Sequence, residues 1–347
     1  MFRSLLFAAL IAAAPAWALA GDLTPKAAGE VVDQLVMHMD GYMDPKVAAE
    51  VQVSLKAHKA EYVKLDTRAA FAEAVSRDLY AASRDRHLKV SLETNDASRG
   101  ARLSDEEQAL VDRRLAYGLM SVRRLPGNIG LLKTSYFEQG EAGGWLSNTM
   151  MELLKDTDAL IIDLRANRGG GGASDEALLG HLSRTPIPMA KIFWRTASGG
   201  TDVMQRRPAT PKDGPLYPDK PVFVLTSPRT ASAAEAFAYD LQAAKRALLV
   251  GETTSGAANP SNRPFRLDYG FRVFIPTGKV VHPTTGGNWE GVGVKPDVEV
   301  PVDQALTEAY ARALAVAKPT VSTPKSEAER AAAIADPKAT LLADQAL

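Results

Sequence analysis

Cysteine is absent from the 347 residues of this chain. Its absence excludes disulfide bonds, thiolate nucleophiles, zinc–thiolate sites and a lipidated N-terminal cysteine. Stability must therefore come from a hydrophobic core, and a chain of this length can bury a large one. The length predicts either one large domain with a smaller one or two domains.

An excess of either charge is also missing, since 41 Lys and Arg residues face 41 Asp and Glu residues. A near-neutral chain gives no electrostatic reason to expect a nucleic acid or an anionic membrane surface as a partner. The sequence leaves the oligomeric state open.

Long apolar runs are scarce, and the clearest one lies at the N-terminus. It follows Arg3, begins at Leu5 and ends in Ala-Leu-Ala at residues 18–20. The run is too short and too rich in small residues for a comfortable membrane span. A basic residue, a short apolar run and an Ala-x-Ala ending are typical of a cleavable secretory signal, here residues 1–20, cut after Ala20. We therefore expect a periplasmic or secreted protein with no stable membrane span after the signal is removed.

Residues 21–86 carry the helical signal. Apolar residues recur at helical spacing between residues 31 and 39, and Pro45 begins a second periodic stretch. Thr67 is a good N-cap residue for a third stretch. The pattern predicts a small, all-α N-terminal lobe.

The pattern changes after His87. Apolar and polar residues alternate over residues 88–92, which predicts a half-buried strand. The short, almost uninterrupted apolar runs at 159–162, 223–225 and 247–250 are typical of strands that are covered on both faces. A helix of about fifteen residues fits between the last two, which is enough for a parallel crossover.

Residues 87–318 are therefore predicted to form an α/β core with a mixed, partly parallel sheet. Within it, residues 264–277 alternate like hairpin strands, and a final helix is predicted for residues 302–317. The Ala-, Lys- and Glu-rich tail, residues 319–347, is expected to be partly mobile. No PDZ-like peptide-binding module is evident between lobe and core.

Ser232 is the first candidate catalytic residue. An apolar strand runs into residues 226–235, TSPRTASAAE, and a helix follows at once. Ser232 thus falls in the first turn of a helix, where the positive N-terminal field favours developing negative charge. The N–H of Ala233 would then be an oxyanion donor, as in a nucleophile elbow. Alternatively, Ser232 or Thr230 merely caps the helix, and Ser227 is a weaker rival nucleophile.

A glycine-rich segment follows the buried strand at 159–162. It reads DLRANRGGGG over residues 163–172. Four glycines allow positive φ and can turn backbone N–H groups toward a bound oxyanion. A phosphate-binding loop is a competing interpretation, but no Gly-Lys-Ser/Thr follows the glycines, and their spacing does not fit the dinucleotide-binding motif. A flexible surface turn is a further alternative.

Taken in order, four runs resemble the tail-specific (C-terminal processing) serine peptidase superfamily. They are residues 163–172, 230–235, 250–256 and 290–297, and the resemblance extends from roughly residue 30 to 310. Residues 85–88 and 288–291 resemble the subgroup of interphotoreceptor retinoid-binding protein and the tricorn core protease. The resemblance implies a core of crotonase-like or ClpP-like ββα units.

One departure from the superfamily affects the choice of base. Many members pair the serine with a lysine about twenty-five residues downstream, but that position is Ala257 and no lysine occurs between Lys245 and Lys279. The tricorn-like branch instead uses a histidine from the N-terminal lobe and a downstream glutamate. By resemblance, His87 would be the base and Glu290 its partner.

The same resemblance implies an oxyanion hole made by Gly169, Gly170 and Ala233. His282 is the main competitor of His87, since it lies eight residues before Glu290. Asp85 would either orient His87 or cap a turn. Arg86 stands where a small residue is more usual.

The predicted activity is peptide-bond hydrolysis through a serine acyl-enzyme, with no metal or organic cofactor. The resemblance implies unfolded or C-terminal segments of exported polypeptides as substrates, bound by strand addition. Two alternatives stay open. One is a non-catalytic carrier of retinoid-like or fatty-acid-like ligands, and the other is an esterase.

Overall fold

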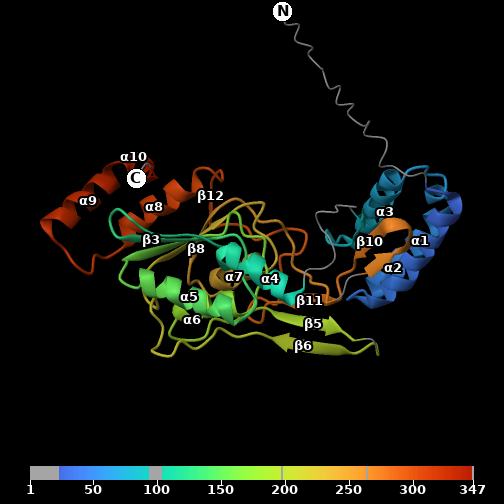
Figure 1. Cartoon of the computed structure of the whole chain (residues 1–347), viewed down its shortest axis with the longest axis horizontal. Coiled ribbons are helices and arrows are strands. Elements are labelled where there is room, and N and C mark those ends of the chain that lie inside the picture. Colours follow the sequence, from blue (N-terminus) through green and yellow to red (C-terminus); the bar gives the residue numbers. More distant parts are fainter. Residues whose placement is uncertain (1–22, 94–103, 197, 263–264, 346–347) are drawn as a thin grey trace, which may run out of the picture.

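The computed structural model describes residues 23–93, 104–196, 198–262 and 265–345 (Figure 1). The predicted signal segment, residues 1–20, lies outside the described residues. Within the described ranges, no helix is both long and apolar enough to cross a membrane.

A six-stranded sheet forms the centre of the molecule. Its five strands from β12 to β3 run parallel, and β2 pairs antiparallel with β3. The parallel centre and the antiparallel edge confirm the predicted mixed sheet. In spatial order the strands are β12 (Val298–Glu299), β8 (Leu248–Gly251), β7 (Val222–Thr226), β4 (Ala159–Asp163), β3 (Ile129–Thr134) and β2 (Leu119–Leu125).

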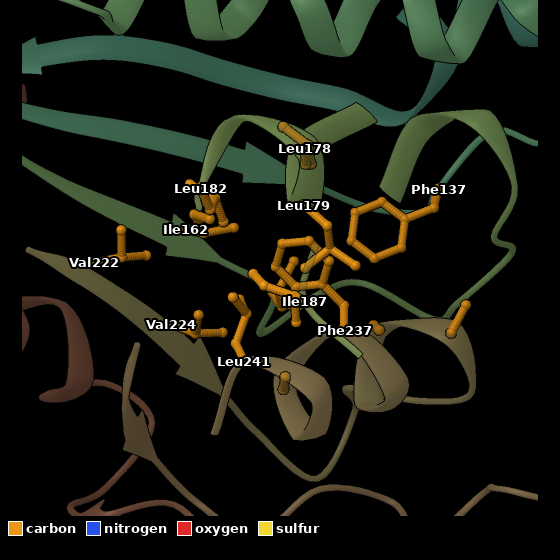
Figure 2. Packing of buried hydrophobic residues seen from close by; sticks show 14 of the residues in the cluster. Phe137, Ile162, Leu178, Leu179, Leu182, Ile187, Val222, Val224, Phe237 and Leu241 are labelled. Carbon is orange, nitrogen blue, oxygen red and sulfur yellow. The ribbon is translucent and has the colours of Figure 1, made fainter. Parts of the chain in front are cut away.

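Both faces of the sheet are buried, which explains why its central strands are continuously apolar. In β4, Leu160 and Ile162 point into one hydrophobic cluster, whereas Ala159 and Ile161 point into the other. Figure 2 shows the first cluster, where Phe137, Leu178 and Phe237 pack beside the strands. Helices therefore pack against β4 and β7 on both faces of the sheet.

The helices that cover the two faces differ in origin. The face of the first cluster is covered by three helices that lie between strands, and the other face is covered by the C-terminal helices. The first set is α5 (Glu141–Leu154), α6 (Ala173–His181) and α7 (Ala233–Ala243), and the second is α8 (Ala305–Val316), α9 (Pro324–Ala335) and α10 (Pro337–Gln345).

The helix predicted at residues 302–317 is present as α8, but it is not the final one, because α9 and α10 follow it. Thr323 caps α9 by accepting the N–H of Ser326, and Pro324 occupies its first turn. Alanine has the highest helix propensity, and Ala333 and Leu341 are buried against the second cluster. The alanine-rich composition therefore builds packed helices here.

The helices expected within residues 21–86 are present, but strands from outside that range join them in one lobe. A three-stranded antiparallel sheet packs on its helices, with the order β1-β10-β9. Phe271 and Ile275 are fully buried in the same cluster as Val31 and Leu35. The lobe contains α1 (Pro25–His38), η2 (Met39–Gly41), α2 (Pro45–Tyr62), α3 (Arg68–Ser83), β1 (Lys89–Leu92), β9 (Phe265–Leu267), η5 (Asp268–Gly270) and β10 (Phe271–Phe274).

A second small sheet lies beside the core and has the order β11-β5-β6. Its hairpin reaches toward the lobe in Figure 1. Arg195 in this hairpin donates from Nε to the carbonyl of Asp40 at 3.1 Å, and Met43 donates its N–H to the carbonyl of Pro276 at 2.9 Å. The remaining elements are α4 (Asp105–Arg114), η4 (Ala116–Gly118), β5 (Lys191–Arg195), β6 (Thr201–Gln205) and β11 (Gly278–Val281).

Leu241→Ala should destabilise the core, because Leu241 in α7 is fully buried in the first cluster. Removing a buried Leu side chain typically costs about 2–5 kcal/mol. Leu153→Ala is the matched control, since Leu153 is 70% exposed and its loss should change stability by no more than about 0.5 kcal/mol. Urea unfolding of both variants measures the difference. Equal costs would contradict the burial of Leu241.

Candidate active site

Ser232 stands at the junction between β7 and α7, as the sequence predicts. Its backbone lies at φ 55° and ψ −123°, a region that a non-glycine residue rarely adopts. The residue is exposed, and its side chain makes no capping hydrogen bond to α7. The strained turn therefore presents, at the end of a central strand, a hydroxyl that has no side-chain hydrogen bond to another described residue.

The rival hydroxyls near Ser232 are structural. Ser227 is buried and donates from Oγ to the carbonyl of Arg165 at 2.7 Å. Thr230 is also buried and donates from Oγ1 to the carbonyl of Leu164 at 2.8 Å. Both hydroxyls fasten the turn after β7 to the loop after β4, and neither is accessible for attack.

The buried carboxylate of Glu235 holds the turn in its strained shape. It accepts the Ser232 N–H at 2.8 Å. It also accepts the amides of Gly256 at 2.7 Å and Ala257 at 2.9 Å. The hydroxyls of Thr254 and Ser255 donate to it at 2.5 and 3.1 Å. Glu235 ends the run at residues 226–235, but the sequence does not predict this role, since its partners lie about twenty residues further along the chain.

The glycine loop after β4 packs directly against Ser232. A Cβ on Gly169 would lie 2.7 Å from Cβ of Ser232 and 3.1 Å from the N atom of Ala233. Because Gly169 also has φ 106°, only glycine fits there without strain. Asn167 anchors the loop: its carbonyl accepts the Ala231 N–H at 3.1 Å, and its Nδ2 donates to Thr134 at 2.9 Å.

The three residues predicted to form an oxyanion hole are not equivalent. The N–H of Gly169 donates to Oδ1 of Asn167 at 2.9 Å, so this amide is already used. The amides of Gly170 and Ala233 donate no hydrogen bond to another described residue. Gly169 therefore supplies space beside Ser232, while Gly170 and Ala233 keep free donors. This corrects the expected role of Gly169.

His87 lies between the lobe and the core, just before β1. Asp85 accepts the backbone N–H of His87 at 2.8 Å, and Tyr42 donates from its hydroxyl to Asp85 at 2.9 Å. The Asp85 carboxylate lies 3.9 Å from Nδ1 of His87. Asp85 thus fixes the main chain of His87, and Tyr42 is a supporting residue that the sequence did not point out.

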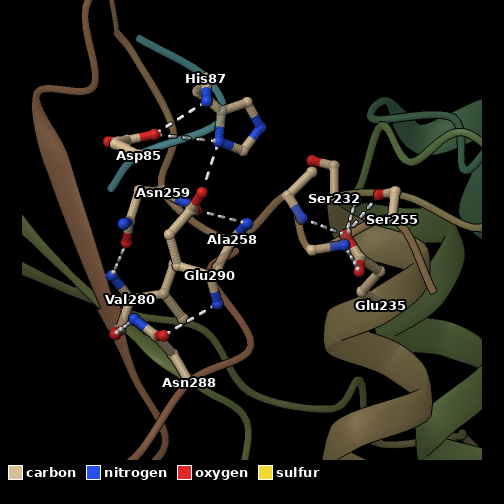
Figure 3. Close-up of polar contacts among 12 residues, drawn as sticks. Asp85, His87, Ser232, Glu235, Ser255, Ala258, Asn259, Val280, Asn288 and Glu290 are labelled. Carbon is tan, nitrogen blue, oxygen red and sulfur yellow. Dashed lines mark hydrogen bonds and ion pairs between the residues drawn. The ribbon is translucent and has the colours of Figure 1, made fainter. Parts of the chain in front are cut away.

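Glu290 is the closer partner of the imidazole. Its Oε2 lies 3.2 Å from Nδ1 of His87 and accepts the amides of Ala258 and Asn259 at 2.9 and 2.8 Å. Asn288 accepts the N–H of Glu290 at 3.0 Å. Figure 3 shows these contacts on one side of the site and Ser232 with Glu235 on the other.

The charges of this cluster alter the pKa of each member. Burial lowers the pKa of His87, but the Glu290 and Asp85 carboxylates outweigh it and raise the pKa above its usual value. Burial raises the pKa of Glu290, but His87 and the amides of Asn259 and Ala258 outweigh it and hold that pKa below the usual range. Burial and the charge of Glu290 raise the pKa of Asp85.

His282, the competing base, has both ring nitrogens engaged. Its Nε2 lies 3.1 Å from the carbonyl of Pro188, and its Nδ1 accepts the amides of Thr284 and Thr285 at 3.2 and 3.3 Å. The side chain is 1% exposed, and burial lowers its pKa. These contacts require the neutral ring with the proton on Nε2, so His282 is a structural residue.

His87 and Ser232 are not hydrogen-bonded to each other among the described residues. The buried Glu235 carboxylate below Ser232 nevertheless raises the pKa of His87, after the larger effects of burial, Glu290 and Asp85. Bonds between a base and a nucleophile are often long in unliganded sites and tighten when substrate binds.

The fold and these contacts can now be compared with known proteins. Residues 128–300 match peptidase family S41. The core of this chain is therefore similar to a family S41 peptidase domain. A carboxy-terminal-processing protease from Bartonella bacilliformis is 27% identical over 197 residues, which cover 54% of this chain and 42% of that protein. This chain therefore spans less than half of the length of that curated relative.

Solved structures share the fold. A candidate peptidase from Parabacteroides merdae has a TM-score of 0.59 at 20% identity, over 86% of this chain and 100% of that chain. The tricorn protease has a TM-score of 0.52 at 14% identity, over 82% of this chain and 35% of that chain. The predicted resemblance to tail-specific and tricorn-type peptidases is thus confirmed.

Among the described residues, one group of acidic and imidazole side chains, between the lobe and the core, lies close enough together to hold a metal ion. Ligand atoms of Asp85, His87 and Glu290 all lie within 4.8 Å of one another. The expected absence of a metal and of an organic cofactor stays a prediction. Asp85 and Glu290 already accept hydrogen bonds from main-chain amides, and Asp85 also accepts one from the Tyr42 hydroxyl.

Glu235→Gln should destabilise the α/β core. The glutamine amide places donor hydrogens where Glu235 accepts hydrogen bonds on both oxygens, so buried donors lose their acceptor. Each orphaned buried donor costs about 1–3 kcal/mol. Urea unfolding measures the loss, and Glu73→Gln on the exposed face of α3 should change stability by less than about 0.5 kcal/mol. If the two variants are equally stable, Glu235 does not anchor the turn.

Proposed function

We propose that this chain is an exported serine peptidase in which Ser232 attacks the peptide carbonyl. The observation that carries the proposal is the exposed Ser232 in a strained strand–helix turn, with no side-chain hydrogen bond to another described residue. The similarity to family S41 supports a peptidase, and the N-terminal signal pattern supports export. Polypeptides are the proposed substrates, in line with the carboxy-terminal-processing relative.

The proposed general base is His87. A neutral imidazole takes the Ser232 proton as the hydroxyl attacks, and the resulting imidazolium is stabilised by Glu290 at 3.2 Å. Asp85 and Tyr42 support the backbone of His87. The imidazolium then gives its proton to the leaving amine, and water repeats the sequence on the acyl-enzyme.

The proposed oxyanion hole consists of the amides of Ala233 and Gly170. Both lack a partner among the described residues, and the Gly169 backbone brings the glycine loop against Ser232 and Ala233. Donors that are fixed before reaction stabilise the developing oxyanion without a reorganisation cost. The positive end of α7 adds to this field.

A fluorophosphonate probe tests the nucleophile and the base. The wild-type protein should be labelled and Ser232→Ala should not, while Ser227→Ala should keep its labelling because Ser227 is buried. His87→Ala should slow labelling by about a hundredfold or more, since general-base catalysis is lost. His282→Ala should retain labelling. Absence of Ser232-dependent labelling between pH 6 and 9 would overturn the serine-hydrolase proposal, and no labelling at all would favour the carrier alternative.

Turnover of matched peptide and ester substrates separates a peptidase from an esterase. We expect measurable peptide cleavage that is lost in Ser232→Ala. Ester hydrolysis without peptide cleavage would overturn the peptidase proposal and leave the serine mechanism in place.

Glu290→Gln should change the pH dependence of acylation. Glu290 raises the pKa of His87, and only neutral His87 accepts the proton, so the acidic limb of the profile should move to lower pH in the variant. The maximal rate should fall by about a hundredfold, because the imidazolium loses its anionic partner. Stopped-flow labelling across pH measures both effects, with Glu73→Gln as the control. A profile identical to wild type would remove Glu290 from the mechanism.

A further inference from the structure

The exposed face of the lobe sheet carries a group of cations beside His87. Strand alternation sends Val90, Phe271 and Val273 into the lobe core, so the residues between them point to solvent. Lys89 pairs with Phe274 across β1 and β10, and Arg272 lies between Ser91 and Arg266. Three positive side chains thus share one face.

A pocket of about 500 Å³ opens on this face, which lies on the lobe in Figure 1. Its lining includes Arg86, Lys89, Arg266 and Arg272, together with His87 and Phe274. Phe274 is 40% exposed, and its ring lies 5.4 Å from the His87 ring. The pocket therefore adjoins the proposed general base.

The charge in this pocket is unbalanced among the described residues. Four cations line it with one carboxylate, Glu93, which lies 3.8 Å from Arg266 in a loose ion pair. Arg272 donates to the neutral hydroxyl of Ser91 at 3.0 Å. The chain as a whole is neutral, so this local excess is not a reflection of composition.

We propose that this pocket binds acidic side chains of the polypeptide substrate next to the bond that is cleaved. The proposal rests on the peptidase function and adds a substrate class to it. Guanidinium and ammonium groups complement carboxylates, and a spread of cations over three strands suits several carboxylates better than a single terminal one. Phe274 adds an exposed apolar surface to the same pocket.

Binding is best measured with Ser232→Ala protein, so that no cleavage occurs and the result does not depend on Ser232 chemistry. The probe is a fluorescein-labelled peptide of Gly, Ser and Glu, compared by anisotropy with the same peptide carrying Gln for every Glu. Introducing Lys89→Glu together with Arg272→Glu into the Ser232→Ala protein should weaken binding of the Glu peptide by about tenfold at low salt. The neutral pair Lys89→Gln and Arg272→Gln should weaken it less.

Lys56→Glu is the matched control, since Lys56 is exposed on α2 and outside the pocket. Raising salt from about 0.1 M to about 1 M shortens the Debye length from about 10 Å to about 3 Å and should erase the preference for Glu. Equal affinity for the Glu and Gln peptides, or equal losses in the Lys56 control, would overturn the proposal. So would a preference that disappears when only the peptide C-terminus is amidated. Serine-probe labelling of the wild-type protein reports separately on the proposed function.

Discussion

Two buried carboxylates and one short segment of main chain hold the site together. Glu235 accepts the amides of Gly256 and Ala257, and Glu290 accepts the amides of Ala258 and Asn259. Burying a carboxylate is costly unless its oxygens are hydrogen-bonded. The amides meet this need at both oxygens of Glu235 but only at Oε2 of Glu290, whose Oε1 has no hydrogen-bond partner among the described residues. The same two carboxylates reach the Ser232 amide and the His87 ring. The segment 256–259 therefore sets the nucleophile and the base relative to each other.

This arrangement also explains why the segment can do without a lysine. Residues 254–259 are small or polar, and their amides rather than a cation compensate Glu235 and Glu290. With no amine in the segment, a base must come from elsewhere in the chain. In the proposed mechanism the lobe supplies His87 as the base, and Glu290 raises the pKa of its imidazole so that the protonated form is stabilised beside the carboxylate.

The sequence predicts those parts of the site that are set by residues close to one another along the chain. The buried strands, the helix after Ser232 and the glycine turn follow from apolar runs and spacing. It does not predict Glu235, whose partners lie on a loop after another strand, or the separate role of Gly169, which depends on the orientation of Asn167. The sequence also does not predict that the β9–β10 hairpin belongs to the lobe, because alternating apolar and polar residues identify a strand but not the hydrophobic core in which it packs.

The division of the molecule into separate hydrophobic cores has a consequence for reactivity. Val31, Leu35 and Phe271 belong to the cluster beneath His87, whereas Phe237 and Leu241 belong to the cluster beneath Ser232. One core supports His87 and the other supports Ser232, but neither core sets the distance between these two residues. The distance between imidazole and hydroxyl thus depends on the joints between the cores, chiefly the Glu290 contact and the bonds of Asp40 and Met43 to the core. A substrate that contacts both sides would draw the base toward the nucleophile, which makes the position of the lobe a natural control point for the reaction.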